Sequence, residues 1–322
     1  MENIEIAGSG YAIAEHCISN HDLEKILDTN DEWITTRTGI KTRYVSSDEN
    51  TSDLGYRAAC QAIEKAKIEK SDIDLIIVGT ITPDNITPSC ACLIQDKLGL
   101  NEAKIMAFDI SAACTGFVYA MQIATYMLSE YSCALVVGAD VNSKLMDYED
   151  RNTSILFGDG AGAVILKKTK SSKQIHHYAQ SSGDHDGFLK GQGIQMAQPL
   201  VNANREVGFL KQNGSEVFRF AVKALEEAIV EVLKKADKNI DEIDYIIPHQ
   251  ANIRIIRNVA KRMKLPVEKF YTNLDVYGNT SGGSIPIAFA QAYEQGVIKA
   301  GMKIIMVGFG AGFTYAASYV EL

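Results

Sequence analysis

Apolar residues along the chain fall into two alternating patterns, short continuous runs and longer stretches with helical spacing. The runs at 75–79, 133–140 and 161–168 have the length and composition of strands buried on both faces. Stretches such as 116–128 instead repeat their apolar residues at helical spacing and predict buried helices. Strands of this kind alternating with helices predict an α/β fold, with mainly parallel sheets covered on both sides by helices.

The pattern occurs twice, which indicates an internal duplication. The segment EKAKIEKSDIDLIIVG (64–79) corresponds to KKADKNIDEIDYIIPH (234–249), an offset of 170 residues. Because two copies are too few for a solenoid, we expect two packed α/β halves, residues 1–170 and 171–322, with the functional site at the seam between them. Three further pairs of segments correspond in the same order, namely the turn and helix after 109 with 277–293, 133–140 with 303–310, and 161–168 with 313–322.

Cys114 lies where a strand-like run gives way to a helical stretch, in the sequence DISAACTGFVYAM (109–121). The first turn of a helix carries unpaired backbone N–H groups and the positive end of the helix dipole, and both favour a thiolate. The position therefore suits a nucleophilic cysteine. A purely structural role is the alternative, because free cysteine is among the most buried residue types.

A histidine and an asparagine fall at corresponding places in the second half. His249 ends the strand-like run YIIPH, and the carboxyl end of a strand is a favourable place for catalysis in α/β sheets. Asn279 lies in YGNTSGG, the turn that corresponds to the one around Cys114. Cysteine, histidine and asparagine far apart in sequence are the set expected of a thiol enzyme. The alternatives are a histidine satisfied by its neighbours and an asparagine that serves only its turn.

Composition and charge narrow the class of protein. The 322 residues carry a net charge of −8, which argues against nucleic acid as the main partner. No apolar run approaches the roughly 18 residues of a membrane-spanning helix. The start MENIEIAG lacks the basic region of a signal peptide, so we expect a cytoplasmic protein with no membrane partner. Cys90 and Cys92 form an isolated C-x-C pair, which predicts neither a disulfide framework nor a metal site.

Seven stretches, in this order, carry a family resemblance: DEWITTRTGI (31–40), DISAACTGF (109–117), LFGDGAGAV (156–164), NGSEVFRFAV (213–222), PHQANIRII (248–256), GNTSGGSIP (278–286) and GFGAGFT (308–314). Together they resemble the β-ketoacyl-acyl carrier protein synthase III family of the thiolase superfamily, along essentially the whole chain. The resemblance implies a thiolase-like duplicated α/β fold, in which two similar halves pack as a five-layered αβαβα sandwich.

The resemblance also implies an acyltransferase that condenses an acyl-CoA primer with malonyl-acyl carrier protein, with loss of CO₂, and so initiates fatty acid biosynthesis. Cys114 is then the acyl acceptor, while His249 and Asn279 stabilise the enolate left by decarboxylation. The backbone N–H groups of Cys114 and Ala311 form a second oxyanion hole. No cofactor is expected to be bound permanently, because the coenzyme A and phosphopantetheine thioesters are substrates.

The same resemblance places coenzyme A, and the distribution of basic residues predicts a docking site for the carrier protein rather than a merely solvated face. Trp33 and Arg151 flank the adenine of coenzyme A and Arg37 lies near its phosphates, which suits the stacking of indole and guanidinium groups on a base. Basic residues around the segment after His249 suit docking of the acidic carrier protein in an otherwise acidic chain. These docking residues are Arg219, Arg254, Arg257, Lys261 and Arg262.

Primer length is expected to depend on the segment 80–92, which resembles the family loop that crosses a homodimer interface and walls the partner's acyl pocket. Thr87 stands where many acetyl-selective relatives have phenylalanine, so the smaller side chain predicts room for primers longer than acetyl. The alternative is that Phe157 or a residue of the loop 181–208 refills this space.

Two other functions stay open from the sequence. One is a specialised ketosynthase of secondary metabolism with the same cysteine, histidine and asparagine chemistry. The other is an inactive partner subunit, which the intact Cys114, His249 and Asn279 argue against. A thiolase is disfavoured, because it needs a second catalytic cysteine near the C-terminus and no cysteine follows Cys133.

Overall fold

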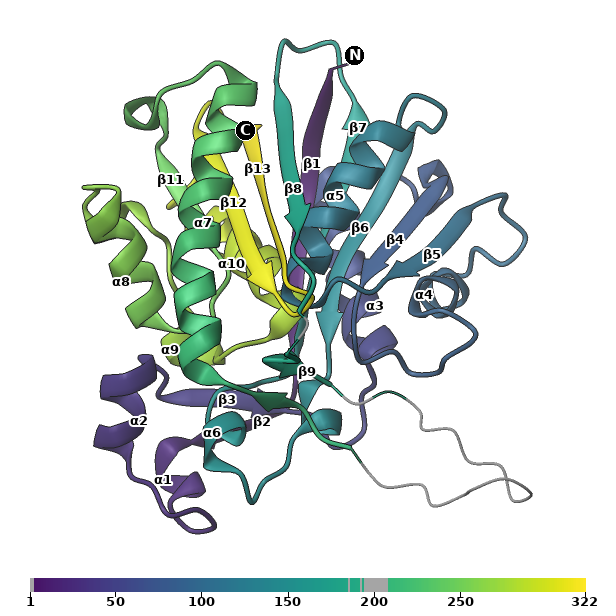
Figure 1. Cartoon of the computed structure of the whole chain (residues 1–322). Helices are drawn as coiled ribbons and strands as arrows, with labels where there is room; N and C mark the ends of the chain where they lie inside the picture. Colours follow the sequence, from purple (N-terminus) through teal and green to yellow (C-terminus); the bar gives the residue numbers. More distant parts are fainter. Residues whose placement is uncertain (1–2, 185, 192, 194–207) are drawn as a thin grey trace.

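The computed structural model describes residues 3–184, 186–191, 193 and 208–322. Two β-sheets form the body of the molecule (Figure 1). The first sheet consists, in spatial order, of β1 (Ile4–Ile13), β7 (Gly160–Lys168), β6 (Cys133–Asp140), β4 (Leu75–Gly79) and β5 (Met106–Ile110). The second consists of β11 (Tyr245–Pro248), β12 (Lys303–Gly310), β13 (Thr314–Glu321) and β8 (Ile175–Ser181).

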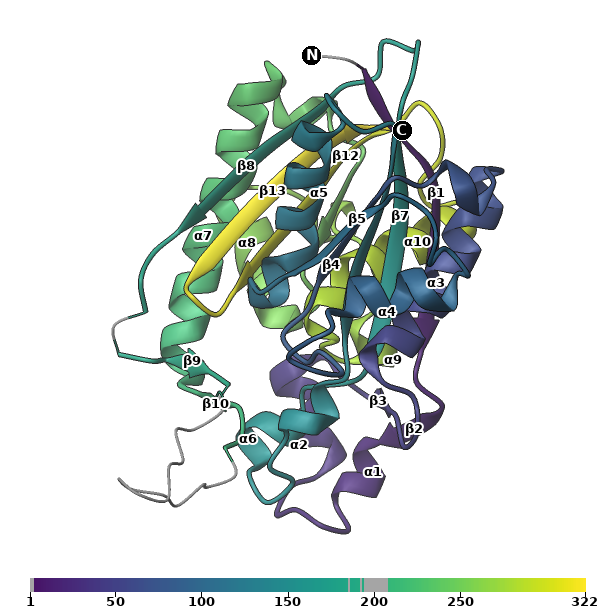
Figure 2. The ribbon, with the colours of Figure 1, turned by 90° about the vertical axis from the view of Figure 1, so that its right-hand side faces the viewer.

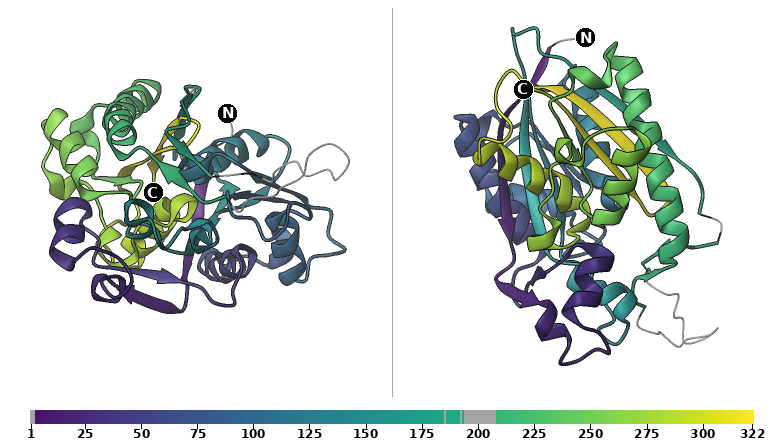
Figure 3. Two further views of the ribbon diagram at one scale, coloured as in Figure 1. Left: turned by 60° about the horizontal axis from the view of Figure 1, so that its bottom comes forward. Right: turned by 90° about the vertical axis from the view of Figure 1, so that its left-hand side faces the viewer.

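Three layers of helices enclose the sheets, which confirms the five-layered αβαβα sandwich. Helices α3 (Thr51–Ala66) and α4 (Cys90–Lys97) share one apolar cluster with the outer face of the first sheet. Helices α5 (Gly116–Met127) and α10 (Ser284–Glu294) lie between the sheets, where a second cluster joins both. Helices α7 (Gly214–Ala236) and α8 (Ile253–Arg262) cover the outer face of the second sheet, as the right-hand view of Figure 3 shows.

The position of a helix in these layers follows from its apolar pattern. In α7 the buried residues recur every three or four positions from Val217 to Ala236, so one face packs on the second sheet and the other meets solvent. Asn213 caps α7 by accepting the N–H of Glu216, and the left-handed Asp237 ends it. Helix α5 has no charged residue and belongs in the central layer.

The duplication is visible in the topology. The order β1-β7-β6-β4 of the first sheet repeats as β8-β13-β12-β11 in the second. The corresponding helices α3 and α7 both end at a non-glycine residue in the left-handed region, Lys67 at φ 54° and Asp237 at φ 53°. Where β5 would have a counterpart, the described part of the second sheet has an isolated bridge between Ile246 and Phe270 instead of a strand. Residue 170 lies in the connection between β7 and β8; the division into halves 1–170 and 171–322 as separate units stays a prediction.

Both sheets are mixed, so the prediction of mainly parallel sheets is wrong. Strand β4 is parallel to β5 and β6, and β11 is parallel to β12. Strands β7 and β13, in contrast, are antiparallel to both of their neighbours. An apolar run shows that a strand is buried on both faces but not which way it runs. Only three residues, 311–313, join β12 to β13, which is too short for a parallel crossover.

The smaller elements gather at the end of the sandwich where β6 and β12 finish (Figures 1 and 2). They are the strand pair β2 (His16–Ser19) and β3 (Thr42–Val45), the strand pair β9 (Leu189–Lys190) and β10 (Lys211–Gln212), and the helices α1 (Asn20–Leu23), α2 (Asp31–Thr38), α6 (Arg151–Ser154) and α9 (Leu274–Tyr277). The buried Arg43 ties several of them together, because its Nη2 donates to Asn20 Oδ1 at 2.8 Å and to the Ile155 carbonyl at 2.7 Å. Within the described ranges, no helix is long and apolar enough to cross a membrane.

Candidate active site

Cys114 lies in a tight turn just before α5 and faces the corresponding turn of the second half. Its turn η2 (Ala113–Thr115) and the turn η6 (Ser281–Gly283) each begin with a non-glycine residue in the left-handed region, Ala113 at φ 47° and Ser281 at φ 50°. Cys114 is buried, and its Sγ lies 3.6 Å from Ser281 Oγ. The two turns that correspond in sequence therefore meet at the seam between the halves.

The three side chains predicted to act together line one narrow cavity. Cys114, His249 and Asn279 all border a space of about 100 Å³ between the halves. The apolar side chains of Phe157, Phe218 and Phe309 are among the others that border it. Aromatic walls of this kind lower the local dielectric constant and so strengthen the interaction of N–H donors with a developing negative charge.

His249 is held in one place and one form. It follows β11, its N–H donates to the Val307 carbonyl at 2.8 Å, and its ring packs edge-on against Phe309. Burial lowers the pKa of His249 to about 3, so the ring is neutral near pH 7. Ser284 Oγ lies 2.6 Å from His249 Nδ1 and 3.3 Å from the Gln250 N–H, which it accepts. No other acceptor for the Ser284 hydroxyl proton occurs among the described residues, so we assign this proton to Nδ1 and the ring proton to Nε2.

Asn279 presents its amide N–H groups rather than its oxygen. Its backbone is fixed on both sides, since its N–H donates to the Leu156 carbonyl at 2.8 Å and its carbonyl accepts the Gly158 N–H at 3.0 Å. Its Oδ1 accepts the Ser281 N–H at 2.9 Å. The side-chain NH₂ is therefore the part of the amide that can donate to a ligand.

The thiol of Cys114 behaves differently from the expectation that the helix N-terminus favours a thiolate. Burial raises its pKa from 9.0 to about 12, and the charge of Asp140 adds to the rise. Hydrogen bonds from Ser281 and from the Cys114 amide act in the other direction. The net rise corresponds to about 4 kcal/mol, whereas a helix terminus supplies at most about 2 kcal/mol. Near pH 7 the side chain is thus mostly the neutral thiol.

The glycine turn after β12 shapes the backbone beside the thiol. A Cβ at Gly310 would lie 2.8 Å from Cys114 N, so any larger residue would crowd this amide. Ala311 lines the same cavity as Cys114, and neither amide donates to a backbone carbonyl among the described residues. Two open N–H groups suit an oxyanion hole, to which Ala311 contributes only its backbone.

A second and larger cavity of about 460 Å³ lies next to Cys114. Ile81, Leu145 and Phe157 are among its apolar lining residues. Thr87 is exposed in the single chain and does not line it. The alternative wall 181–208 is described only in part, because 185, 192 and 194–207 lie outside the described residues; its described residues Leu189 and Lys190 do line the cavity.

The three residues predicted to bind coenzyme A lie together on the surface. The guanidinium carbons of Arg37 and Arg151 lie 4.6 Å and 5.1 Å from the centroid of the Trp33 ring. Arg151 also donates to the Asp28 carbonyl at 2.5 Å, which joins α6 to the loop before α2. Both arginines already contact the indole, so a base can stack between Trp33 and Arg151 only after that guanidinium moves away.

The predicted docking residues lie on neighbouring helices. Arg254, Arg257, Lys261 and Arg262 are exposed on α8, and Arg219 is exposed on α7. A shallow groove bordered by Phe218 and Val222 separates the two helices. Glu216 pairs with Arg219 and Glu226 pairs with Arg262. No carboxylate among the described residues forms an ion pair with the other three, so a net positive surface remains.

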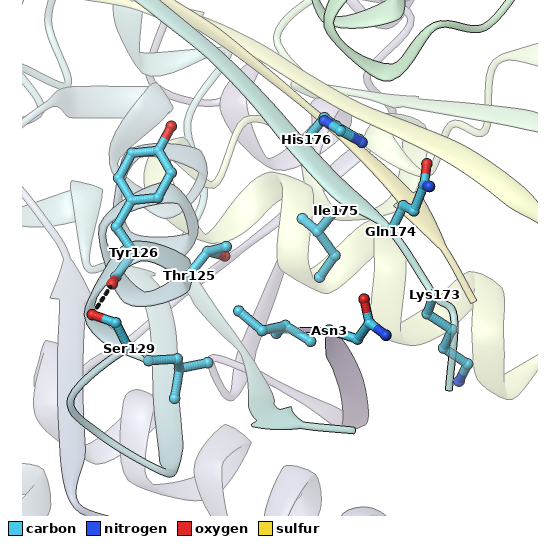
Figure 4. A pocket seen from close by; sticks show the side chains of 10 residues that line it. Asn3, Thr125, Tyr126, Ser129, Lys173, Gln174, Ile175 and His176 are labelled. Carbon is cyan, nitrogen blue, oxygen red and sulfur yellow. Dashed lines mark hydrogen bonds between the residues drawn. The ribbon is translucent and has the colours of Figure 1, made fainter. Parts of the chain in front are cut away.

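Another cavity, of about 470 Å³, is separate from this site (Figure 4). Thr125, Tyr126 and Ser129 border it at the far end of α5, opposite the start of β8 with His176. The 12-residue α5 is roughly 18 Å long, so this cavity lies far from Cys114. No cluster of three or more His, Cys, Asp or Glu side chains that could hold a metal ion occurs among the residues that the structure describes.

Solved structures with the same fold define the class of protein. The crystal structure of 3-oxoacyl-[acyl-carrier-protein] synthase III from Aquifex aeolicus matches with a TM-score of 0.91 at 39% identity, over 99% of this chain and 100% of that one. The priming β-ketosynthase of the R1128 polyketide pathway matches with a TM-score of 0.90 at 30% identity, over 99% and 96%. The chain is a condensing acyltransferase with the thiolase fold.

Sequence relatives narrow this class to one family. Residues 108–183 match the family model of 3-oxoacyl-[acyl-carrier-protein (ACP)] synthase III, and residues 233–322 match the model of its C-terminal part. A β-ketoacyl-[acyl-carrier-protein] synthase III of Clostridium perfringens is 48% identical over an alignment that covers all of both chains. The chain belongs to the β-ketoacyl-[acyl-carrier-protein] synthase III family.

Proposed function

We propose that this chain carries out the condensation that initiates fatty acid biosynthesis with Cys114 as nucleophile and with His249 and Asn279 as donors to the enolate. An acyl-CoA primer and malonyl-acyl carrier protein are the substrates, and a 3-oxoacyl-acyl carrier protein is the product. The assignment of residues rests on one observation, the convergence of these three side chains on a single narrow cavity.

In the first half-reaction, Cys114 Sγ attacks the thioester carbonyl of the acyl-CoA. The negative oxygen that forms accepts the backbone N–H groups of Cys114 and Ala311. The bond between the acyl carbon and the coenzyme A sulfur then breaks, and the thiol proton of Cys114 ends on that sulfur. Because the step is neutral overall, it suits a thiol whose pKa is raised by burial.

In the second half-reaction, the malonyl group loses CO₂ and the electron pair of the broken C–C bond forms an enolate. His249 Nε2–H and an Asn279 N–H donate to the enolate oxygen, and removal of one such donor typically slows a reaction ~10²–10³-fold. The enolate carbon attacks the acyl group, and Cys114 leaves and takes up the one proton that the reaction consumes. A neutral imidazole is needed here as a donor, which agrees with the lowered pKa of His249.

Two surface regions are assigned to the substrates. Trp33 and Arg151 hold the adenine of coenzyme A and Arg37 its phosphates; their mutual contacts support this assignment. The side chain of Asn252, just before α8, donates to the Arg37 carbonyl at 3.0 Å and so joins α2 to the basic helix. Arg219, Arg254, Arg257, Lys261 and Arg262 form the docking surface for the acidic carrier protein.

The proposal includes a homodimer formed through the edge of the first sheet. Among the described strands β5 pairs only with β4, so its outer edge presents free backbone groups, and Met106 at its start is exposed (Figure 1). The Asp109 carboxylate of β5 accepts the N–H groups of Cys90 and Ala91 at 2.7 Å and 2.9 Å. This anchors the loop with the 77% exposed Ile86 and with Thr87 beside the same edge.

Mass spectrometry of the acyl-enzyme tests the assignment of residues. After incubation with an acyl-CoA, the wild type is expected to carry the acyl group on the peptide with Cys114, and Cys114→Ala is expected to carry none. Addition of malonyl-acyl carrier protein should then release the 3-oxoacyl product from the wild type only. Condensation by a folded Cys114→Ala variant would refute the nucleophile. A wild type that no acyl-CoA modifies would indicate an inactive partner subunit instead.

Light scattering on the protein as it elutes from a size-exclusion column measures its mass in solution and tests the dimer separately. A mass of two chains is expected for the wild type and a lower mass for Met106→Lys, because an edge lysine opposes strand pairing. A wild-type monomer at micromolar concentration would contradict this part of the proposal. The specialised ketosynthase is the weaker candidate function, since the polyketide ketosynthase is the more distant of the relatives described above.

A further inference from the structure

A buried carboxylate joins the two halves next to the candidate site. Asp140 is the last residue of β6 and is 0% exposed. Its Oδ1 accepts the N–H groups of Ile81 and Thr82 at 2.8 Å and 3.2 Å, together with the hydroxyls of Thr80 and Thr82 at 3.0 Å and 2.8 Å. Its Oδ2 accepts the Gly282 N–H of the second half at 2.9 Å. All of these contacts bring a hydrogen-bond donor to the carboxylate, which is the surrounding that a buried anion requires.

The duplication gives Asp140 a counterpart, Gly310. These two residues end the corresponding strands β6 and β12, and Gly282 and Cys114 are the second residues of the corresponding turns η6 and η2. On one side of the seam, glycine at 310 leaves the Cys114 N–H open, because a Cβ there would lie 2.8 Å from Cys114 N. On the other side, the Asp140 carboxylate fills the equivalent space and binds the equivalent N–H of Gly282. The same backbone arrangement thus receives a substrate oxygen in one half and a carboxylate of the protein in the other.

The turn that Asp140 holds also carries two groups of the candidate site. The Ser281 hydroxyl accepts the Cys114 S–H, with Sγ and Oγ 3.6 Å apart. The Ser281 N–H donates to Asn279 Oδ1 at 2.9 Å and so aims the amide N–H groups of Asn279 at the cavity. Any shift of the turn therefore moves the partner of the thiol and the orientation of the amide together.

We propose that Asp140 is a positioning residue for the condensation: by binding the Gly282 N–H of the opposite half, it fixes the turn that orients the Cys114 thiol and the Asn279 amide. The inference rests on the proposed roles of Cys114 and Asn279. Asp140 hydrogen-bonds to no reacting atom among the described residues and acts through Gly282 on the turn that carries Ser281.

Two neighbours of Cys114 act on its pKa in opposite directions, and this difference can be measured. The titratable side chains that face the thiol among the described residues are Asp140 and the neutral His249. The negative charge of Asp140 raises the pKa of Cys114. The Ser281 hydroxyl accepts the S–H of the neutral thiol but can turn its own proton to the thiolate, and this lowers the pKa. Removing the charge and removing the hydroxyl should therefore shift the thiol in opposite directions.

The test measures the rate at which iodoacetamide alkylates Cys114 against pH, by mass spectrometry of the peptide that contains it. Asp140→Asn keeps the shape but places an amide where an acceptor is needed. Its alkylation profile is expected to move to lower pH, by roughly one unit or more, and its condensation rate to fall roughly tenfold or more. Ser281→Ala is expected to move the profile to higher pH. This readout requires no turnover, so it is independent of whether Cys114 is the nucleophile.

Asp159→Asn is the matched control. Asp159 is a second buried carboxylate; it accepts groups of Ser143 and Ser46 and no group of the turn η6. Its replacement should destabilise the fold while leaving the Cys114 profile at the wild-type position. A folded Asp140→Asn variant with the wild-type profile overturns the proposal. If Asp140→Asn does not fold, a wild-type profile in Ser281→Ala overturns it equally, because the turn then has no influence on the thiol.

Discussion

Ser284 Oγ lies 2.6 Å from His249 Nδ1, and this contact decides which nitrogen of the ring carries the proton. The same oxygen accepts the Gln250 N–H at 3.3 Å, and its own proton has no acceptor other than Nδ1 among the described residues. The ring must then present Nε2–H to the cavity that it shares with Cys114 and Asn279. A neutral ring with the other proton arrangement would offer an acceptor there and would repel an enolate oxygen.

Replacement of Ser284 by alanine should therefore slow decarboxylation of malonyl-acyl carrier protein more than acylation of Cys114 by acyl-CoA. Each half-reaction is measured separately, decarboxylation by the release of CO₂ and acylation by the mass of the acyl-enzyme. Ser318→Ala is the matched control, because Ser318 Oγ contacts Nδ1 of a different buried histidine, His177, at 2.8 Å. A Ser284→Ala enzyme with a normal decarboxylation rate would show that the ring chooses its tautomer without this hydroxyl.

Loss of a side chain that donates to the enolate should also slow decarboxylation, and by a larger factor. His249→Ala and Asn279→Ala are each expected to lower decarboxylation ~10²–10³-fold while Cys114 still accepts an acyl group. The reason is that both groups donate to the enolate oxygen and neither is needed for the attack on acyl-CoA. If His249→Ala abolished acylation to the same extent, His249 would also have to activate the thiol.

The two buried histidines should make the protein less stable in acid. Burial lowers the pKa of His177 and of His249 to about 3, against 6.5 in the unfolded chain. The unfolded chain therefore binds more protons between pH 3 and 6.5, so this stability is complete above pH 6.5 and is lost as the pH falls toward 3. Asp140 and Asp159 act with the opposite sign, because burial raises their pKa.

A comparison with His177→Gln isolates one of these groups. Chemical denaturation at a series of pH values is expected to give a slope of unfolding free energy against pH that is smaller in the variant by up to about 1.4 kcal/mol per pH unit. His177 lies away from the candidate site, between Ser318 Oγ and Thr125 Oγ1, so condensation at pH 7 should change little. Equal slopes in the two proteins would mean that His177 is protonated in the folded state.

The sequence supports the layered fold because its signals are local. The pairing of 64–79 with 234–249 is recognisable since a helix end, an acidic turn and a buried strand follow one another directly in each copy. Strand direction was out of reach, because β7 and β13 are buried on both faces whichever way they run. The place of Cys114, His249 and Asn279 on one cavity followed from the duplication combined with the family resemblance.

The residues that hold this site were missed because their contacts are distant in sequence. Ser284 touches His249 across 35 residues, and Asp140 touches Gly282 across 142. Ser284 lies in GNTSGGSIP (278–286) and Asp140 in the strand-like run 133–140, but neither has a partner nearby in the sequence that would reveal its role. The raised pKa of the Cys114 thiol was missed for a related reason, because burial is a property of the packed halves and the helix start is a property of the local chain.

Charge reversal on α8 should weaken use of the carrier protein selectively. Arg254→Glu with Lys261→Glu is expected to raise the KM for malonyl-acyl carrier protein severalfold at low salt, with much less effect on acylation by acetyl-CoA. The cause is repulsion between the new carboxylates and an acidic partner, and added salt should reduce the difference.

A control for that variant needs the same change of net charge at another place. Lys67→Glu with Lys299→Glu provides it, since both lysines are exposed after α3 and before β12, away from α8. An unchanged KM in the α8 variant, or an equal rise in the control, would place the docking surface elsewhere.

The length of the primer should depend on the cavity beside Cys114. Its volume of about 460 Å³ exceeds what an acetyl group fills, and Ile81, Leu145 and Phe157 line it. Each buried CH₂ of a longer chain gains ~0.8 kcal/mol, so selectivity depends on whether something closes the space. Thr87 does not line the cavity of its own chain, and in the proposed dimer it faces the partner's cavity instead.

We therefore expect kcat/KM of the wild type to stay high from acetyl-CoA through butyryl- and isobutyryl-CoA. Octanoyl-CoA extends the same series of measurements to a longer primer. Thr87→Phe should lower the values for the longer primers while leaving acetyl-CoA nearly unchanged, because a phenyl ring fills the far end of the partner's pocket. Phe157→Leu is the comparison within one chain. It enlarges the cavity that Phe157 and Cys114 both line, and it should favour the longer primers. Strict acetyl selectivity of the wild type would contradict the prediction. A Thr87→Phe profile identical to that of the wild type, beside an altered Phe157→Leu profile, would mean that the chain's own residues alone limit the primer and that the loop 80–92 does not reach the partner's cavity.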